Sequence, residues 1–127
     1  VSNGGLNAPV TDMAKWIAFL MGSPANDAVL KRSSLEEMFR PVVPVVPGGP
    51  GEQGVGEGAM GLSFFVEKHQ GLDFIAHSGS QNGFMSHFYV HLPTRTAYVV
   101  AFNTDAKTRA LDAALRDVIV KHVWSAR

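Results

Sequence analysis

The sequence predicts an α+β fold, in which an antiparallel sheet meander is flanked by N-terminal helices and closed by a C-terminal helix. Apolar side chains recur at helical spacing in residues 11–21 and again in residues 107–124. Between them, residues 60–103 contain short runs of apolar, aromatic and β-branched residues separated by turn residues. Short strands joined by short turns pair with their neighbours in the chain, so a meander is the simplest sheet.

The length and composition are those of one soluble domain. A chain of 127 residues can bury a substantial core, and 46% of these residues are apolar. The formal net charge is zero, so there is no basic field that would attract nucleic acid. No apolar run approaches the roughly 18 residues that a membrane span needs. Because cysteine is absent, disulfides, thiolate zinc sites and a cysteine nucleophile are excluded.

Two helices are predicted before the sheet. The first covers Thr11–Met21, starts near the threonine and stops at Gly22. Its apolar stripe consists of Met13, Trp16, Ile17, Leu20 and Met21. A second, short helix starts at Ser33, which has the spacing of a capping box with Glu36. Residues 41–59 are rich in proline and glycine, which indicates an extended surface loop.

Four strands and a helix complete the chain. The strands are predicted near residues 60–68, 72–78, 84–92 and 96–103. Asn82-Gly83 tolerates positive φ at both positions, so it predicts a tight hairpin between the second and third of these strands. The last segment should form a helix over about residues 107–124 that packs on the sheet. Its apolar face is expected to comprise Leu111, Leu115, Val118, Ile119 and Val123.

A polar triplet, His77-Ser78-Gly79, ends the second predicted strand and is followed by Ser80. Glycine has no Cβ, so a ligand can approach the amides of the strand itself within hydrogen-bonding distance. The sequence therefore predicts a binding edge for a small molecule at this position.

The order of several short motifs resembles the serine β-lactamase and penicillin-binding-protein superfamily, in particular the class C β-lactamase-like esterases and peptidases. His77-Ser78-Gly79 resembles the third motif of that superfamily in its His-x-Gly form. The resemblance covers nearly the whole chain, through Gly4-Gly5-Leu6, Thr11-Asp12-Met13-Ala14, Met60-Gly61-Leu62-Ser63-Phe64, Gly83-Phe84-Met85-Ser86 and residues 97–103.

This resemblance implies a serine hydrolase that cleaves an ester, an amide or a peptide through an acyl-enzyme, without a metal or other cofactor. His77 would take the place of the motif lysine, and the backbone amide of Ser80 would stabilise the oxyanion. Ser78, Gly79 and Asn82 would bind the substrate. The resemblance also favours a bacterial periplasmic or secreted enzyme.

The nucleophile motif Ser-x-x-Lys is absent, and so are Tyr-x-Asn and Ser-Asp-Asn. Ser80-Gln81-Asn82 has the spacing Ser-x-Asn, but it directly follows the third motif, whereas the superfamily carries that element on a separate helical loop. The chain also starts at Val1 without an initiator methionine. We therefore expect residues 1–127 to be the C-terminal portion of a β-lactamase-like domain, inactive alone and completed by the N-terminal half of the same protein. An incomplete sheet exposes an edge, which favours self-association.

The sequence also permits a non-catalytic function and contains a histidine pair that suggests a metal site. The alternative to an enzyme is a non-catalytic α+β module that binds a small molecule. His87 and His91 lie four residues apart on one predicted strand, on the same face as Tyr89. A zinc site needs three or four converging ligands, and no carboxylate is obviously placed to complete one, so no metal site is predicted.

Overall fold

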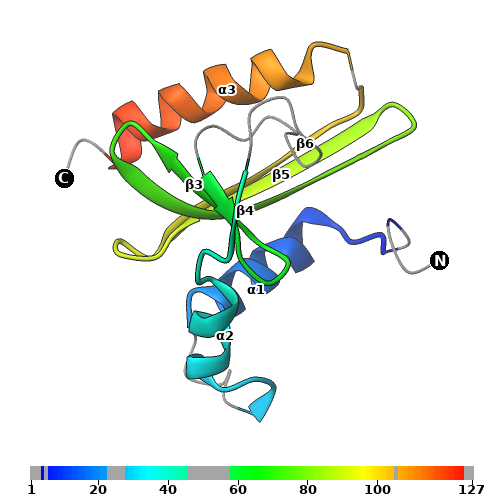
Figure 1. Cartoon of the computed structure of the whole chain (residues 1–127). Coiled ribbons are helices and arrows are strands. Elements are labelled where there is room, and N and C mark those ends of the chain that lie inside the picture. The colour runs from blue at the N-terminus through cyan, green and yellow to red at the C-terminus, as the bar shows by residue number, and fades with distance from the viewer. Residues whose placement is uncertain (1–3, 5, 23–27, 46–57, 105, 125–127) are drawn as a thin grey trace.

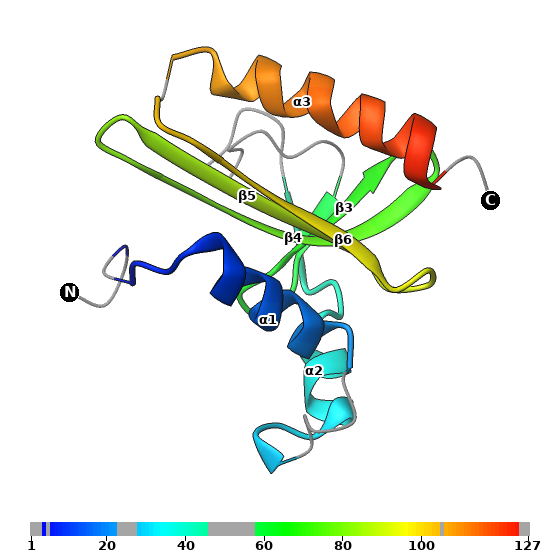
Figure 2. The same cartoon turned by 180° about the vertical axis from the view of Figure 1, so that it is seen from behind.

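A computed structural model describes residues 4, 6–22, 28–45, 58–104 and 106–124. It contains helices α1 (Val10–Leu20) and α2 (Arg32–Met38), strands β1 (Val43–Pro44), β2 (Gly58–Met60), β3 (Phe65–His69), β4 (Leu72–Gln81), β5 (Phe84–His91) and β6 (Thr96–Phe102), helix α3 (Thr108–Ile119) and a π-helical segment, η2 (Val120–Trp124). Helix α3 covers one face of the sheet, and α1 and α2 lie on the other (Figures 1 and 2). The predicted α+β class is confirmed.

The sheet is the predicted antiparallel meander. Its strands lie in the order β1-β2-β3-β4-β5-β6, and each is antiparallel to its neighbours. Two hairpins close on two-residue turns in which both residues have positive φ: Gln70 and Gly71 at 49° and 79°, and Asn82 and Gly83 at 47° and 80°. These values are typical of type I′ turns, whose twist matches that of the flanking strands. The predicted hairpin at Asn82-Gly83 is therefore confirmed.

Alternating side chains of the central strands supply two apolar cores, one on each face of the sheet. The core on the α1 and α2 side consists of Ile17, Leu20, Leu35, Phe39, Phe64, Ile75, Phe88 and Val90. The core on the α3 side consists of Phe65, Phe74, Ala76, Tyr89, Val120 and Trp124. Within the described residues, no helix has the length and apolar character that crossing a membrane requires.

Two predictions about the segment before β3 are wrong. Residues 41–59, expected as a loop, contain β1 and most of β2, and Val43 pairs with Met60. Residues 46–57 of that predicted loop lie outside the described residues. The single strand expected over residues 60–68 is interrupted after Met60. There, a Cβ on Gly61 would lie 2.3 Å from the carbonyl oxygen of Met38, so only glycine fits against the end of α2.

The predicted helix caps do not form. Helix α1 starts after Pro9, whose carbonyl oxygen accepts hydrogen bonds from the next turn, and not at Thr11. Helix α2 starts after Lys31, so Ser33 lies inside the helix. Glu36, expected to complete a capping box, instead accepts a hydrogen bond of 3.0 Å from Arg32 one turn earlier. The ion pair between Arg32 and Glu36 thus takes the place of the predicted capping box between Ser33 and Glu36.

Helix α3 faces the sheet with a different side from the predicted one. Thr108, Asp112, Arg116, Val120 and Trp124 are buried, one at every fourth position along α3 and η2. Leu111, Val118 and Val123, expected in the core, are exposed, and Leu115 and Ile119 are only half-buried. The reason lies in the sheet, whose face beneath α3 carries polar side chains that Asp112 and Arg116 can pair with. Buried polar groups need such partners.

Candidate functional site

The third-motif part of β4 extends beyond the end of β3. Strand β3 begins at Phe65, whose partner on β4 is Ala76. Residues 77–81 therefore pair with β5 on one side, while no strand of the described residues pairs with them on the other. The β4–β5 hairpin can be followed in Figure 1 as it extends away from β3. This arrangement leaves one edge of the motif open.

The register shows which backbone groups point to that open edge. A type I′ turn makes Gln81 and Phe84 the hydrogen-bonded pair that closes the hairpin. Hydrogen-bonded and non-hydrogen-bonded pairs alternate along antiparallel strands, and the register here is uninterrupted from Ile75 to Gln81. The amides of His77 and Gly79 thus point toward β5. Those of Ser78 and Ser80 point to the open edge.

A cavity of about 640 Å³ lies against this part of the sheet. Residues 6–10 and Met13, which lead into and belong to α1, form one wall. The opposite wall is formed by His77, Ser78 and Gly79 of β4, by Ser86, His87 and Phe88 of β5, and by residues at the hairpin end and on β6. The cavity is large enough to hold a drug-sized molecule.

The five predicted site residues are divided between two places. His77, Ser78 and Gly79 line the cavity, whereas Ser80 and Asn82 are exposed near the tip of the hairpin and do not line it. The ring of His77 also lies 5.5 Å from that of Phe65, centroid to centroid. A Cβ on Gly79 would meet only the Oγ atom of Ser86, at 3.7 Å, among the described residues. Packing within the chain therefore does not require glycine there.

The comparison with protein families matches residues 2–121 to the Beta-lactamase family. The chain belongs to this family. The match covers almost the whole chain, so it confirms the resemblance inferred from the order of the motifs. It places the chain in a family of serine-hydrolase type. Comparisons with curated proteins and with solved structures give no match.

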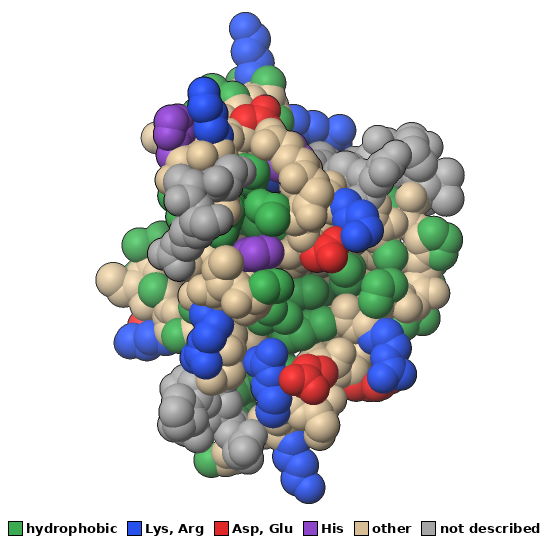
Figure 3. Space-filling model, turned by 90° about the vertical axis from the view of Figure 1, so that its left-hand side faces the viewer, with side chains coloured by type: hydrophobic (Ala, Val, Ile, Leu, Met, Phe, Trp, Pro, Cys, Tyr) green, Lys and Arg blue, Asp and Glu red, His purple; other side chains and the backbone are tan. Residues whose placement is uncertain are grey.

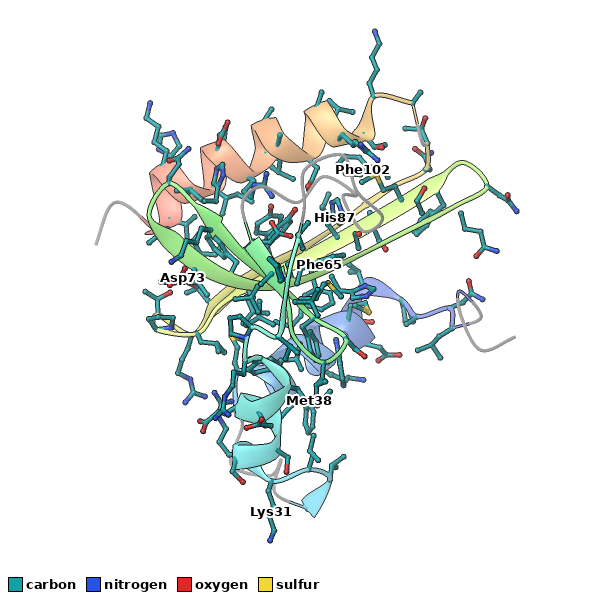
Figure 4. The ribbon with its side chains drawn as sticks, in the orientation of Figure 1. Lys31, Met38, Phe65, Asp73, His87 and Phe102 are labelled. Carbon is teal, nitrogen blue, oxygen red and sulfur yellow. The ribbon has the colours of Figure 1, made fainter. Side chains whose placement is uncertain are left out.

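This β-lactamase-family chain also contains a buried group of polar side chains, called here the buried polar cluster: Glu67, His87, Tyr89, Asp112 and Arg116. Figure 4 shows His87 between the sheet and α3. The hydroxyl of Tyr89 donates to Oδ2 of Asp112 at 2.9 Å and accepts from Nη1 of Arg116 at 2.9 Å. The same Nη1 lies 3.2 Å from Oε2 of Glu67, and Nδ1 of His87 lies 2.8 Å from Oδ2 of Asp112.

Burial dominates the electrostatics of the buried polar cluster. It raises the pKa of Glu67 to about 7, because desolvation outweighs the attraction of Arg116 and His87. Burial also raises the pKa of Tyr89 and that of the neighbouring Tyr98 well above the usual range, so both phenols stay protonated.

Four of the described buried atoms lack a hydrogen-bond partner: His87 Nδ1, whose short contact with Asp112 lacks hydrogen-bond geometry, Tyr98 OH, Asp112 Oδ1 and Arg116 Nε. Such groups carry a desolvation cost.

Sequence reasoning missed this cluster in the β-lactamase-family chain. The available signal was the spacing of Thr108, Asp112 and Arg116, which recur every four residues in phase with Val120 and Trp124. The apolar stripe that contains Leu111, Leu115 and Val118 is the clearer pattern in the sequence, and it predicts a different face of α3 as the buried one. The spacing of His87 and His91 in the sequence suggests a metal ligand and gives no sign of a contact with Asp112. Among the residues that the structure describes, no group of three or more His, Asp or Glu side chains is arranged to hold a metal ion.

Proposed function

We propose that this chain forms one wall of the active site of a serine hydrolase, which cleaves an ester or an amide through an acyl-enzyme. The observation that carries the proposal is the open edge of β4, where the amides of Ser78 and Ser80 are free of β5 and where His77, Ser78 and Gly79 line a cavity. Attack on a carbonyl group places negative charge on its oxygen. A backbone amide held in place at a strand edge can stabilise that negative charge by donating a hydrogen bond to the oxygen.

Each residue of the wall has a distinct task in this mechanism. The amide of Ser80 donates to the developing oxyanion, a contribution of roughly 3 kcal/mol for one such donor. His77 orients hydrogen bonds around the base and attracts an anionic group when its imidazole is protonated. Ser78 and Gly79 border the cavity on β4, and Gly79 leaves room for the backbone or carbonyl of the substrate. Asn82 lies outside the cavity at the tip of the hairpin, so it binds a part of the substrate that extends beyond the cavity.

The nucleophile and the base belong to another part of the same protein, since Ser-x-x-Lys is absent here. Residues 1–127 are then the C-terminal portion of a β-lactamase-like domain. The surface supports this interpretation, because Leu6, Val29, Val42, Val43 and Leu62 are all exposed. In Figure 3, hydrophobic side chains gather over the middle of one face, with charged side chains around them. Apolar side chains gathered on one face are typical of contacts with further protein.

The isolated chain should form no covalent adduct with a fluorescent penicillin or a fluorophosphonate, because the activated serine lies elsewhere. Intact-protein mass spectrometry after incubation measures this directly. The full-length protein that carries the chain serves as the positive control and should gain one equivalent of probe. A stoichiometric adduct on any serine of residues 1–127 would contradict the proposal.

A non-catalytic binding module is the second candidate, and the cavity favours it, because this chain encloses about 640 Å³ without a nucleophile. The two candidates differ in what precedes the chain. A Ser-x-x-Lys motif upstream in the same reading frame supports the hydrolase, whereas its absence, together with an unlabelled full-length protein, supports the binding module.

Replacing His77 by Ala in the full-length protein should lower kcat/KM toward a p-nitrophenyl ester at least about tenfold, or roughly 1.4 kcal/mol of transition-state stabilisation. The melting temperature should move little, because His77 is exposed and contributes few packing contacts. Steady-state kinetics and thermal unfolding measure the two effects. His122→Ala, which removes an exposed imidazole from η2, is the matched control. Equal losses of activity in both variants would remove His77 from the mechanism.

A further inference from the structure

The buried polar cluster meets the candidate site at His87. This residue is 4% exposed, and its imidazole lies between the sheet and α3, on the face opposite α1, so β5 borders the cavity at His87 while the side chain points away from it. In the register of β4 and β5 it lies directly opposite Ser78. The pair is a non-hydrogen-bonded one by the alternation derived above, and in such pairs the two side chains lie closest together. The imidazole of His87 and the side chain of Ser78 are therefore neighbours on the α3 face of the sheet.

The carboxylate of Asp112, which faces His87, is held by Tyr89 and, through Tyr89, by Arg116. Oδ2 of Asp112 lies 2.8 Å from Nδ1 of His87 and accepts the hydroxyl of Tyr89 at 2.9 Å. Arg116 fixes that hydroxyl through Nη1, again at 2.9 Å, and reaches Glu67 on β3. The carboxylate of Asp112 is only 2% exposed as a residue, so water contributes little to its position. Helix α3 is thus attached to β3 and β5 by side chains that converge behind His87.

With Glu67 and Asp112 both ionised, the buried polar cluster holds two negative charges and one permanent positive charge, that of Arg116. The ionisable groups near His87 are Glu67 from β3 and Asp112 and Arg116 from α3; the protonated phenols of Tyr89 and Tyr98 and the imidazole of His91 complete the surroundings. With a protonated imidazole, two anions face two cations. With a neutral imidazole, one negative charge remains uncompensated in a site that excludes water, which is costly. Glu67, whose pKa burial raises to about 7, can take up the proton that removes this charge.

We propose that His87 is a positioning residue for the third motif: Asp112 holds its imidazole behind Ser78, and α3 thereby sets the geometry of the Ser78–Ser80 edge. This inference rests on the proposed function for its effect on catalysis, but not for its effect on structure. It assigns a role to a histidine and a carboxylate that lie outside the motif. Neither touches the reacting atoms; both act through β4.

The test uses Asp112→Asn in the full-length protein, because asparagine keeps the size of aspartate and removes its charge. Asp117→Asn is the matched control: it lies on the same helix, and its carboxylate contacts Nε2 of His69 at 2.7 Å, but it is exposed and away from the cavity. In Asp112→Asn, kcat toward a p-nitrophenyl ester should fall about tenfold while KM changes less than twofold. Asp117→Asn should change neither constant.

Nuclear magnetic resonance gives a second readout that needs no activity. The chain contains five histidines, so labelling with ¹⁵N-histidine yields a small set of imidazole signals. Asp112→Asn should shift the ring nitrogens of His87 and, in a uniformly labelled sample, the backbone amides of Ser78 and Ser80. Asp117→Asn should shift only His69 and its surroundings. Equal, small changes at Ser78 and Ser80 in both variants would overturn the proposal.

A pair of substitutions at His87 separates positioning from simple packing. Asparagine keeps a polar group near the place of Nδ1 that can contact Asp112, whereas leucine fills the space with an apolar group. His87→Asn should retain at least half of the kcat and the amide positions of Ser78 and Ser80, and His87→Leu should lose both. Equal losses contradict the positioning role. If the wild-type protein neither hydrolyses esters nor reacts with the fluorophosphonate, the proposed function fails, and the amide positions still decide the role of His87.

Discussion

Replacing Arg116 by Met should lower the free energy of unfolding by about 3–5 kcal/mol, the largest effect that we expect from a single substitution in this chain. Arg116 is 6% exposed, and its guanidinium contacts Glu67 and the hydroxyl of Tyr89. Methionine keeps much of the side-chain volume but leaves the carboxyl group of Glu67 and the hydroxyl of Tyr89 buried without the guanidinium that they contact. Urea denaturation of the protein at neutral pH measures the change.

Arg109→Met provides the control, because Arg109 lies on the exposed side of the same helix. It should change the free energy of unfolding by no more than about 0.5 kcal/mol. Adding Glu67→Gln to Arg116→Met should recover part of the loss, since the carboxylate that had lost its partner is then neutral. A similar, small effect of both arginine substitutions would mean that the buried polar cluster is hydrated in solution.

Between pH 4.5 and pH 7.5, the wild-type protein should lose on the order of 3 kcal/mol of stability relative to Glu67→Gln. Burial raises the pKa of Glu67 from 4.5 to about 7. In this range the folded protein keeps a proton that the unfolded chain releases. The unfolded state therefore binds fewer protons, and stability falls as the pH rises. Below pH 4.5 both states are protonated, and above about pH 7 both are ionised, so the difference levels off at each end.

The free energy of unfolding, measured at several pH values for both proteins, tests this slope. Only the difference between wild type and Glu67→Gln isolates Glu67, since the other titratable groups are common to the two. Glu37→Gln, on the exposed side of α2, removes a carboxyl group far from the buried polar cluster and should run parallel to the wild type. Parallel curves for Glu67→Gln as well would show that Glu67 is ionised throughout the range.

Local patterns were sufficient to predict the sheet and its central hairpin. Asn82-Gly83 is read correctly because the required positive φ is a property of those two residues, whatever surrounds them. The orientation of α3 could not be read in the same way. Its buried face is decided by Glu67 and Tyr89, which precede Arg116 in the chain by 49 and 27 residues. Without knowledge of those partners, the stripe around Leu115 is the better local match to a core.

The candidate site shows the same division between local and distant information. The triplet at His77 is visible in the sequence because its residue types and spacing form a motif. The alternation of β5 also places His87 and Tyr89 on one face. What lies behind that face, Asp112 on a helix that follows later in the chain, depends on how the sheet and α3 pack. Pairing of Val43 with Met60 was missed for the same reason.

The order of the strands in the sheet is their order in the chain, and this makes the proposed catalytic wall modular. Residues 72–91 form one uninterrupted hairpin, bounded by surface turns at Gln70-Gly71 and at residues 93–95. Surface turns are where insertions and recombination breakpoints are best tolerated. A replacement hairpin of equal length would keep its register with β3 and β6, because the side-chain alternation and the turn fix that register. The binding edge can therefore be exchanged as one unit, provided that the replacement hairpin keeps the side chains that face α3, among them His87 and Tyr89.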